Sequence, residues 1–272
     1  MDAKLQRRVQ RYGWDRAASH YERYWQKQLQ IAQTRLLEMA ALRLGEKVLD
    51  VSCGTGMVTF RAAEAVGPQG QVLGTDISQT MIDTAREEAA RRAFSQVTFG
   101  RMDAEELEVE EGAFDAVLNG LGLMFVPDVA KALREMHRAL RAGGRAVAAV
   151  WGERSRCGWA GVFPIMDSRV KSEVCPLFFQ MGTRDTLKKR FESAGFADVV
   201  QNRISTMLYY ESADTALGAV LQGGAMALAY SRFDDSTRDE VRTEYLASIE
   251  PYRKGTAYEV PAEFVVTCGR KT

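Results

Sequence analysis

Short apolar runs alternate with longer segments that carry apolar residues every three or four positions. The runs occupy residues 47–51, 71–76, 96–104, 113–120 and 144–151. Such runs predict strands buried on both faces of a sheet, and the helical spacing between them predicts crossover helices. We therefore expect an α/β protein with a doubly wound, mostly parallel sheet. The expected helices begin near Met57 and cover 78–92 and 129–140.

The chain before this core predicts one long helical region. Its aromatic and small residues recur at helical spacing in residues 11–25, and residues 29–42 continue the pattern to a stop at Gly45. The stripe consists of Trp14, Ala17, Ala18, Tyr21 and Trp25. Packing of this helix on the core is the simplest interpretation.

The chain after Trp151 predicts two further strands and a helical insertion. Thr183 is expected to cap a helix that runs to Ser193. Strands are expected at 197–209 and 257–270, which brings the sheet to seven strands. The interpretation divides the chain into an N-terminal helical lid segment (1–45), a core (46–152), an acceptor-pocket segment (153–182) and C-terminal core strands (183–272) with a helical lid insertion (211–255).

Composition narrows the class of protein. Thirty-six basic and 36 acidic residues cancel, so no electrostatic footprint favours nucleic acid or an anionic membrane surface. No apolar stretch approaches the ~20 residues of a membrane span, and the N-terminus lacks a signal-peptide pattern. The four cysteines show no metal-ligand spacing and the two histidines are too few for a histidine-rich site. We expect a cytoplasmic protein with free thiols and no metal.

The loop after the first expected strand is the strongest candidate for ligand binding. Residues 52–56 read Ser-Cys-Gly-Thr-Gly, between a buried strand and a helix. Open α/β sheets bind ligands at this edge, and glycines let the backbone approach them closely. No Gly-Lys-Ser/Thr follows, which excludes a P-loop, and the third glycine of a dinucleotide fingerprint is missing.

Acidic residues end the next two expected strands at the same edge. Asp76 is placed to accept both hydroxyls of a ribose, because a carboxylate offers two acceptor oxygens. Asp103 lies in the third run, which ends in an acid at the same edge. The simpler alternative for Asp76 is helix capping, a role that Ser78 can fill itself.

Five ordered motifs carry a family resemblance. VLDVSCGTG, GTDIS, MDAEEL, FDAVLNGLGLMFVPD and LREMHRALRAGGRAV are similar to the motifs of class I S-adenosylmethionine (SAM) dependent methyltransferases. The chain most resembles the group that includes the ubiquinone and menaquinone biosynthesis methyltransferases, chiefly over residues 12–152. Ser52 stands where the family usually has glycine or another small residue, and its hydroxyl suits a ligand carboxylate.

The resemblance implies a Rossmann-like fold, SAM as cofactor with S-adenosylhomocysteine as product, and a small-molecule acceptor. It also implies that the N-terminal segment closes over the cofactor and that Asp103, with the Ala104 backbone, reads an adenine amino group. The cofactor-binding residues expected are Tyr21, Trp25, Asp50, Ser52, Cys53, Gly54, Gly56, Asp76, Ile77, Met81, Asp103, Ala104, Asn119 and Leu121. The substrate-binding residues expected are Met124, Trp151, Trp159 and Phe163.

Methyl transfer from a sulfonium is an in-line displacement, so the protein contributes mainly by aligning the nucleophile with the methyl group and the sulfur and by excluding water. A hydroxyl or carbon acid would also need a base. His20, in the segment expected to close, is the candidate base, whereas His137 fits a scaffold helix. Gly223 and Gly224 are expected to mark a hinge in the lid insertion. The absence of an Asn/Asp-Pro-Pro-Tyr/Phe run after the fourth strand disfavours methylation of nucleic-acid bases.

Two other classes remain as alternatives. A nicotinamide-dependent oxidoreductase would use the same strand, glycine loop and Asp76, but the third glycine and a Tyr-xxx-Lys pattern are missing. A non-catalytic SAM-binding or interaction protein would keep the loop and lose the acceptor pocket. The sequence leaves open the acceptor, the atom methylated and the choice between monomer and homodimer.

Overall fold

Eight strands form one mixed sheet in the computed structural model, which describes residues 3–170 and 178–272. The strands are β1 (Lys47–Val51), β2 (Gln71–Asp76), β3 (Val97–Arg101), β4 (Phe114–Gly120), β5 (Leu140–Trp151), β6 (Ala197–Tyr210), β7 (Arg253–Lys254) and β8 (Ala257–Arg270). The α-helices are α1 (Ala3–Ala40), α2 (Met57–Val66), α3 (Gln79–Arg91), α4 (Val129–Ala139), α5 (Val162–Asp167), α6 (Thr186–Ser193), α7 (Ala213–Leu221), α8 (Ala227–Tyr230) and α9 (Asp235–Ile249).

The strand order is β3-β2-β1-β4-β5-β8-β6, and the two-residue β7 pairs with β8 outside this path. Strands β1 to β5 pair in parallel, whereas β8 runs antiparallel to both of its neighbours, β5 and β6. This confirms the expected Rossmann-like sheet of seven mostly parallel strands. The order reverses between β1 and β4, which is where open α/β sheets bind their ligands.

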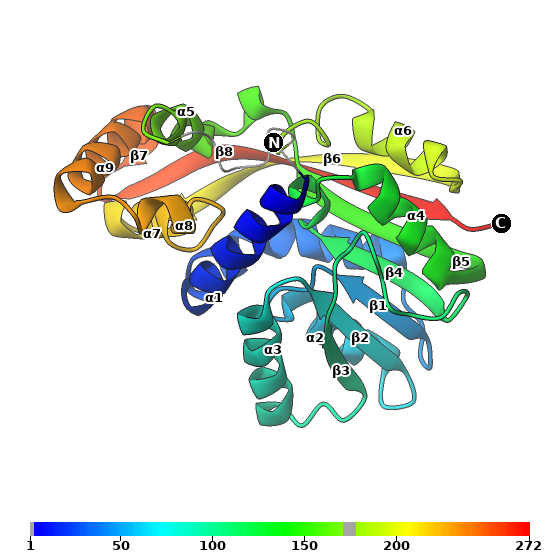
Figure 1. Cartoon of the computed structure of the whole chain (residues 1–272). Helices are drawn as coiled ribbons and strands as arrows, with labels where there is room; N and C mark the ends of the chain where they lie inside the picture. The colour runs from blue at the N-terminus through cyan, green and yellow to red at the C-terminus, as the bar shows by residue number, and fades with distance from the viewer. Residues whose placement is uncertain (1–2, 171–177) are drawn as a thin grey trace.

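Successive residues of the central strands belong to two hydrophobic cores. Val48 and Val147 pack with α2, α3 and the end of α1, while Leu49 and Ala148 pack with α4 and the C-terminal helices. Side chains alternate across a strand, so this division places helices on both faces of the sheet. The doubly wound expectation therefore holds, and Figure 1 shows the helices on either side of the strands.

Helix α1 is longer than any other described helix and crosses from one core to the other. Trp25 and Leu29 join the core that contains α4, whereas Leu36 joins the core that contains α2. Figure 1 shows its N-terminal part between α3 and the α7–α9 helices. None of the described helices is long and apolar enough to cross a membrane.

The end of α1 lies earlier than expected. The helix stops at Ala40, and Ala41 takes the left-handed conformation, with φ of 45°. Arg145 from β5 donates to the carbonyls of both Ala40 and Ala41 and pairs with Glu46. The guanidinium thus satisfies carbonyls that a helix end leaves without partners. Gly45 was therefore the wrong stop, since a distant arginine supplies the cap.

The insertion after β6 is helical, as expected, and contains the three α-helices α7, α8 and α9. Gly223 and Gly224 lie in the turn between α7 and α8, and Ser212 and Asp234 cap α7 and α9 by accepting from backbone amides.

The expected helix cap at Thr183 was also wrong. Its hydroxyl donates to the Phe179 carbonyl, and α6 starts three residues later.

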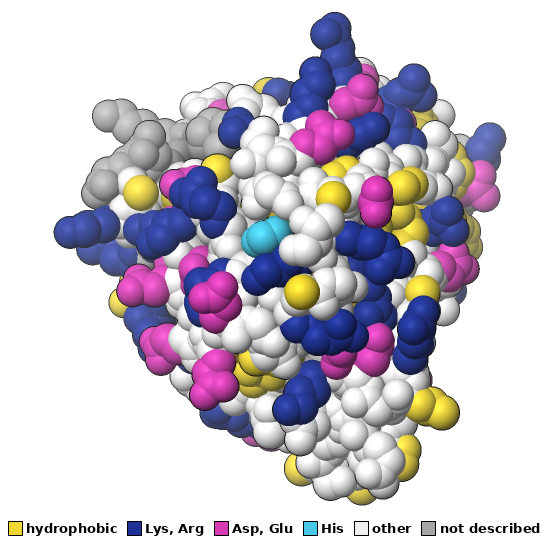
Figure 2. Space-filling model, turned by 90° about the vertical axis from the view of Figure 1, so that its right-hand side faces the viewer, with side chains coloured by type: hydrophobic (Ala, Val, Ile, Leu, Met, Phe, Trp, Pro, Cys, Tyr) yellow, Lys and Arg dark blue, Asp and Glu magenta, His cyan; other side chains and the backbone are white. Residues whose placement is uncertain are grey.

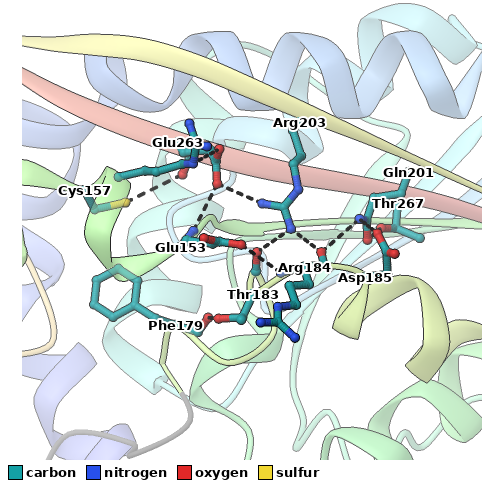
Figure 3. Close-up of polar contacts among 12 residues, drawn as sticks. Glu153, Cys157, Phe179, Thr183, Arg184, Asp185, Gln201, Arg203, Glu263 and Thr267 are labelled. Atoms are coloured by element: carbon teal, nitrogen blue, oxygen red, sulfur yellow. Dashed lines mark hydrogen bonds and ion pairs between the residues drawn. The ribbon is translucent and has the colours of Figure 1, made fainter.

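A buried carboxylate on β8 organises the segment that follows β5. Glu263 pairs with Arg203 of β6 at 2.8 Å and accepts from the Glu153 amide at 3.1 Å. Arg203 also donates to the carbonyls of Gly182 and Arg184, and Figure 3 shows these contacts converging on its guanidinium. The pair therefore holds the chain around residues 178–186 against the sheet. Cys175, expected to be a free thiol, lies outside the described residues.

We predict that Arg203→Met lowers the free energy of unfolding by about 3 kcal/mol, because Glu263 would remain buried without its main partner. The side chain of Glu263 is 3% exposed, so water cannot replace the guanidinium. Urea unfolding measures the change. Arg190→Met, at an exposed site on α6, is the control and should stay within about 0.5 kcal/mol. Equal effects of the two variants would contradict the structural role of the pair.

Candidate functional site

The loop after β1 turns sharply at the switch point of the sheet. Ser52, Gly54 and Gly56 have φ of 59°, 56° and 94°, and Leu121 after β4 has φ of 69°. Ser52 and Leu121 are not glycines, so their positive φ angles indicate local backbone strain, and such strain is concentrated at functional sites. The two loops also approach closely, since a Cβ on Gly122 would lie 2.4 Å from the Ser52 Cβ.

A first cavity opens above these loops with about 680 Å³ of empty space. The carboxyl edge of β1 to β4 forms its floor, and the first half of α1 forms its roof. The lining residues are Arg7, Gln10, Trp14, Tyr21, Ser52, Gly54, Asp76, Ile77, Met81, Asp103, Ala104, Gly120, Leu121, Gly122, Phe125, Val126 and Pro127. Nine of these residues were expected at the cofactor: Tyr21, Ser52, Gly54, Asp76, Ile77, Met81, Asp103, Ala104 and Leu121.

Asp76 sits at the end of β2 with both carboxylate oxygens already engaged by backbone amides. The Gly54 and Ser78 amides each donate to it at 2.9 Å. Each oxygen retains a lone pair, so the carboxylate can still accept two ribose hydroxyls. Burial raises its pKa to about 6. The side chain of Ser78 caps α3 by accepting from the Met81 amide, so the capping role considered as the alternative for Asp76 is already filled by Ser78.

Asp50 lies beneath the loop and is fully buried. Its Oδ2 accepts from the Thr59 hydroxyl at 2.6 Å, while Oδ1 has no partner. Burial raises the pKa of this carboxyl to about 7. An unpartnered buried oxygen beside a ligand loop suits a cofactor that brings a cation or a donor. Two acids without a cationic partner, Asp76 in the wall of the cavity and Asp50 buried behind it, therefore fit SAM, which carries both a sulfonium and an ammonium group.

Polar contacts hold the first half of α1 onto the cavity. Arg7 contacts Asp103 and Glu105 beyond β3. Asp15 accepts from the Ser78 hydroxyl at 2.6 Å at the start of α3. The roof is therefore attached at two points of the floor by charged groups.

A second, apolar cavity with about 490 Å³ of empty space adjoins the first. The cavities share Trp14, Tyr21, Leu121 and Phe125. The remaining lining is Trp25, Leu29, Met124, Trp151, Trp159, Val162, Phe163, Phe178, Val220, Gly224, Ala225 and Met226. All four residues expected to bind substrate are among them. Aromatic rings dominate this wall, with Trp151 and Trp159 centred 4.8 Å apart.

Five residues expected at the cofactor do not line the first cavity. Asp50 is buried beneath the loop. Within the loop, Cys53 packs in the core that contains α2, and a Cβ on Gly56 would meet Phe60 at 2.7 Å. Asn119 is fully buried, and its amide donates to Val51 and accepts from Gly122 and Leu123. It therefore joins the two loops. Trp25 lines the second cavity instead and donates to the Ala219 carbonyl.

His20 is not brought to either cavity. It lines a polar surface hollow with Arg16 and Arg238, on the outer side of α1. The geometry therefore gives no basis for His20 as the catalytic base. Adjacent residues of an α-helix point in different directions around its axis, so Tyr21 lines the cavities while His20 lines the surface hollow.

Sequence reasoning missed several residues of the roof and rim. The roof residues missed are Arg7, Gln10 and Trp14, and the rim residues are Gly120, Gly122, Phe125, Val126 and Pro127. Trp14 was part of the recognised aromatic stripe, and the rim residues were part of a recognised motif. Nothing in the local sequence marked Arg7, because its partners are about a hundred residues away.

The strand order, the glycine loop at the switch point and the acid after β2 define the class: α/β proteins that bind a nucleoside-containing cofactor at the carboxyl edge of the sheet. Within that class the chain belongs to the ubiE/COQ5 methyltransferase family, whose pattern it matches over residues 21–157. This confirms the expected family and SAM as its cofactor.

A demethylmenaquinone methyltransferase of Staphylococcus aureus is 34% identical over 191 residues, which cover 64% of this chain and 77% of that protein. Solved structures share the fold. A Bacillus halodurans protein described as a putative methyltransferase has a TM-score of 0.61 at 20% identity, covering 88% of this chain and 98% of its own. Phosphoethanolamine N-methyltransferase 2 of Haemonchus contortus, in complex with SAM, has a TM-score of 0.60 at 18% identity. The match covers 95% of this chain and 57% of that one.

We predict that alanine at Gly54 and at Gly56 has different consequences. A Cβ on Gly54 would lie 3.7 Å from Tyr21 and narrow the first cavity, so SAM binding should weaken at least tenfold, with a loss of stability limited to the strain of positive φ, about 1–2 kcal/mol. A Cβ on Gly56 would overpack Phe60 and cost about 1–3 kcal/mol beyond the backbone strain. Calorimetry and thermal unfolding separate the two effects.

Gly45→Ala is the control for strain, because this glycine also has positive φ, 81°, and nothing lies within 4 Å of its Cβ. Normal SAM affinity in Gly54→Ala would show that the loop is only a structural turn.

We predict that SAM binding tightens by roughly tenfold between pH 5.5 and 7.5 and releases protons. The folded pKa values of about 7 for Asp50 and about 6 for Asp76 exceed the ordinary 3.8. The unliganded fold thus holds extra protons, and these groups make it less stable as pH rises from about 4 to 7. A bound cation favours the carboxylates and reverses this loss.

Calorimetry in buffers of different ionisation enthalpy counts the released protons. Asp50→Asn should reduce the release and flatten the pH dependence of stability relative to the parent protein. Identical profiles for parent and variant would assign the dependence to other groups.

Proposed function

We propose that the protein transfers the methyl group of SAM to a small, largely apolar molecule bound in the second cavity. The observation that carries the proposal is the shared wall of the two cavities. The first is edged with the acids Asp76 and Asp103, the second has no acid in its described lining, and Tyr21 and Leu121 border both. A cofactor in the first cavity would therefore meet an acceptor in the second.

The residues of the first cavity suit the parts of SAM. Asp76 would accept the ribose hydroxyls, and Asp103 with the Ala104 backbone would read the adenine amino group. Ser52 and Gly54 would hold the methionine portion, which Tyr21 covers. When bound, the cofactor supplies an electrophilic methyl group. The chain contributes alignment of the acceptor and a dry cavity.

The second cavity offers alignment rather than acid–base chemistry. Its described lining contains no His, Asp, Glu or Lys. Burial raises the pKa of Tyr21 well above its ordinary value, so its hydroxyl stays protonated and acts as a donor. We infer that the acceptor brings its own nucleophile. Eight aromatic residues in the lining suit a flat ring, in keeping with the demethylmenaquinone methyltransferase among the relatives.

The charge of the surface supports a small molecule over nucleic acid. On the face seen in Figure 2, Lys and Arg side chains are interspersed with Asp and Glu rather than gathered in one basic stripe. The net charge of the chain is zero. Binding to a phosphate backbone requires a concentrated positive surface.

A labelled-methyl assay tests the proposal. The panel holds reduced naphthoquinones, phenols, thiols, amines, a protein mixture and an oligonucleotide. We expect transfer to an apolar small molecule. Binding of SAM without transfer to any of them would favour a non-catalytic SAM-binding protein, and binding of NAD in place of SAM would favour an oxidoreductase.

We predict that Gly224→Leu lowers turnover at least tenfold while the Kd for SAM stays within threefold, because Gly224 lines only the second cavity. A Cβ there has room, with its nearest neighbour at 3.4 Å, so the fold should survive. Ala142→Leu also introduces a leucine, at an exposed position near the start of β5 and away from the cavity residue Trp151 at its other end, and is the control. Unchanged turnover in Gly224→Leu would place the acceptor elsewhere.

A further inference from the structure

Arg7 joins the roof of the first cavity to two acids beyond β3. Its Nε lies 3.0 Å from Asp103 Oδ2, and its Nη2 donates to Glu105 Oε2. The side chain is 31% exposed and lines the cavity. A guanidinium can serve two carboxylates at once because its donors form a rigid fork, which the ammonium of lysine lacks.

The two acids need this cation. The Glu105 side chain is 1% exposed, and its other oxygen accepts from the Asp128 amide at 3.1 Å. Asp103 is half-buried beside it and accepts from the Glu105 amide at 2.9 Å. Two neighbouring carboxylates repel each other, and a buried one is costly without a partner. Arg7 offsets both effects.

The orientation of Asp103 follows from these contacts. Its Oδ1 faces the Glu105 amide, and its Oδ2 faces the Arg7 guanidinium. With both oxygens fixed, the carboxylate cannot rotate freely, and its remaining lone pairs keep a set direction at the rim of the cavity. Hydrogen-bond discrimination between ligands depends on such fixed acceptors, because a mobile group can adapt to either ligand.

We propose that Arg7 is a positioning and specificity residue for the cofactor, which fixes Asp103 to read the adenine amino group and holds α1 closed over that end of the cavity. This inference rests on the proposed placement of adenine at Asp103. Asp15 ties the same helix to Ser78 independently, so α1 should stay docked when Arg7 is changed.

Calorimetry with S-adenosylhomocysteine and its deaminated analogue, S-inosylhomocysteine, tests the proposal. The analogue carries a carbonyl oxygen where adenine has the amino group, so a fixed Asp103 should reject it. We expect the parent protein to prefer the adenine ligand at least tenfold. Arg7→Gln should weaken S-adenosylhomocysteine at least tenfold and reduce that preference at least threefold. Arg8→Gln, at an exposed position on the same helix, is the matched control and should change neither value.

Arg7→Lys keeps the charge but not the fork, so it should restore part of the affinity and little of the preference. Equal weakening of both ligands by Arg7→Gln would reduce Arg7 to a structural tie and overturn its specificity role. Unchanged affinity would overturn the proposal entirely. Failure of the parent protein to bind either ligand would instead refute the cofactor site, and a parent that binds both equally would refute the placement of adenine at Asp103.

Discussion

The burial of two acids at the carboxyl edge of the sheet is the constraint on which the site depends. Asp50 and Asp76 lie at or beneath the glycine loop, and their contacts in the described part of the chain are a hydroxyl and backbone amides, not Lys or Arg. Burial without a cation disfavours their charged forms, which is why both pKa values rise. The fold thus carries a local electrostatic cost at this edge, which a nearby cationic group of a ligand would offset.

Helix α1 covers this edge, and different forces hold it along its length. Its end is fixed by Arg145, which caps the last carbonyls from the opposite end of the sheet. Its middle is fixed by burial of Trp25 and Leu29. Its first half is attached over the cavity by ion pairs and hydrogen bonds from Arg7 and Asp15. The second half of the helix is therefore held by apolar burial and the first half by polar contacts.

The sheet could be predicted from the sequence because its information is local. Each parallel strand is a short apolar run followed by a polar edge, and the ends of β1, β2 and β8 fell within a residue of expectation. The acids and glycines of the site could be predicted because strand ends place them together. What could not be predicted depends on distant partners. The Arg145 cap ended α1 before Gly45, and Asn119 turned out to join two loops. His20 faced outward because helical spacing gives the period of a stripe but not the surface that each side meets.

The shared wall between the cavities links the two binding events. Trp14 and Tyr21 come from the roof helix and border both spaces, and their rings meet edge to face at 5.6 Å. Phe125, from the loop after β4, continues this wall against Trp14 at 4.9 Å. A ligand that orders the roof over the first cavity therefore also completes one side of the second. The cost of ordering these rings falls on the first ligand, so the second binds to a surface that is already formed. If the cofactor occupies the first cavity and the acceptor the second, as proposed, this shared wall would favour entry of the cofactor before the acceptor.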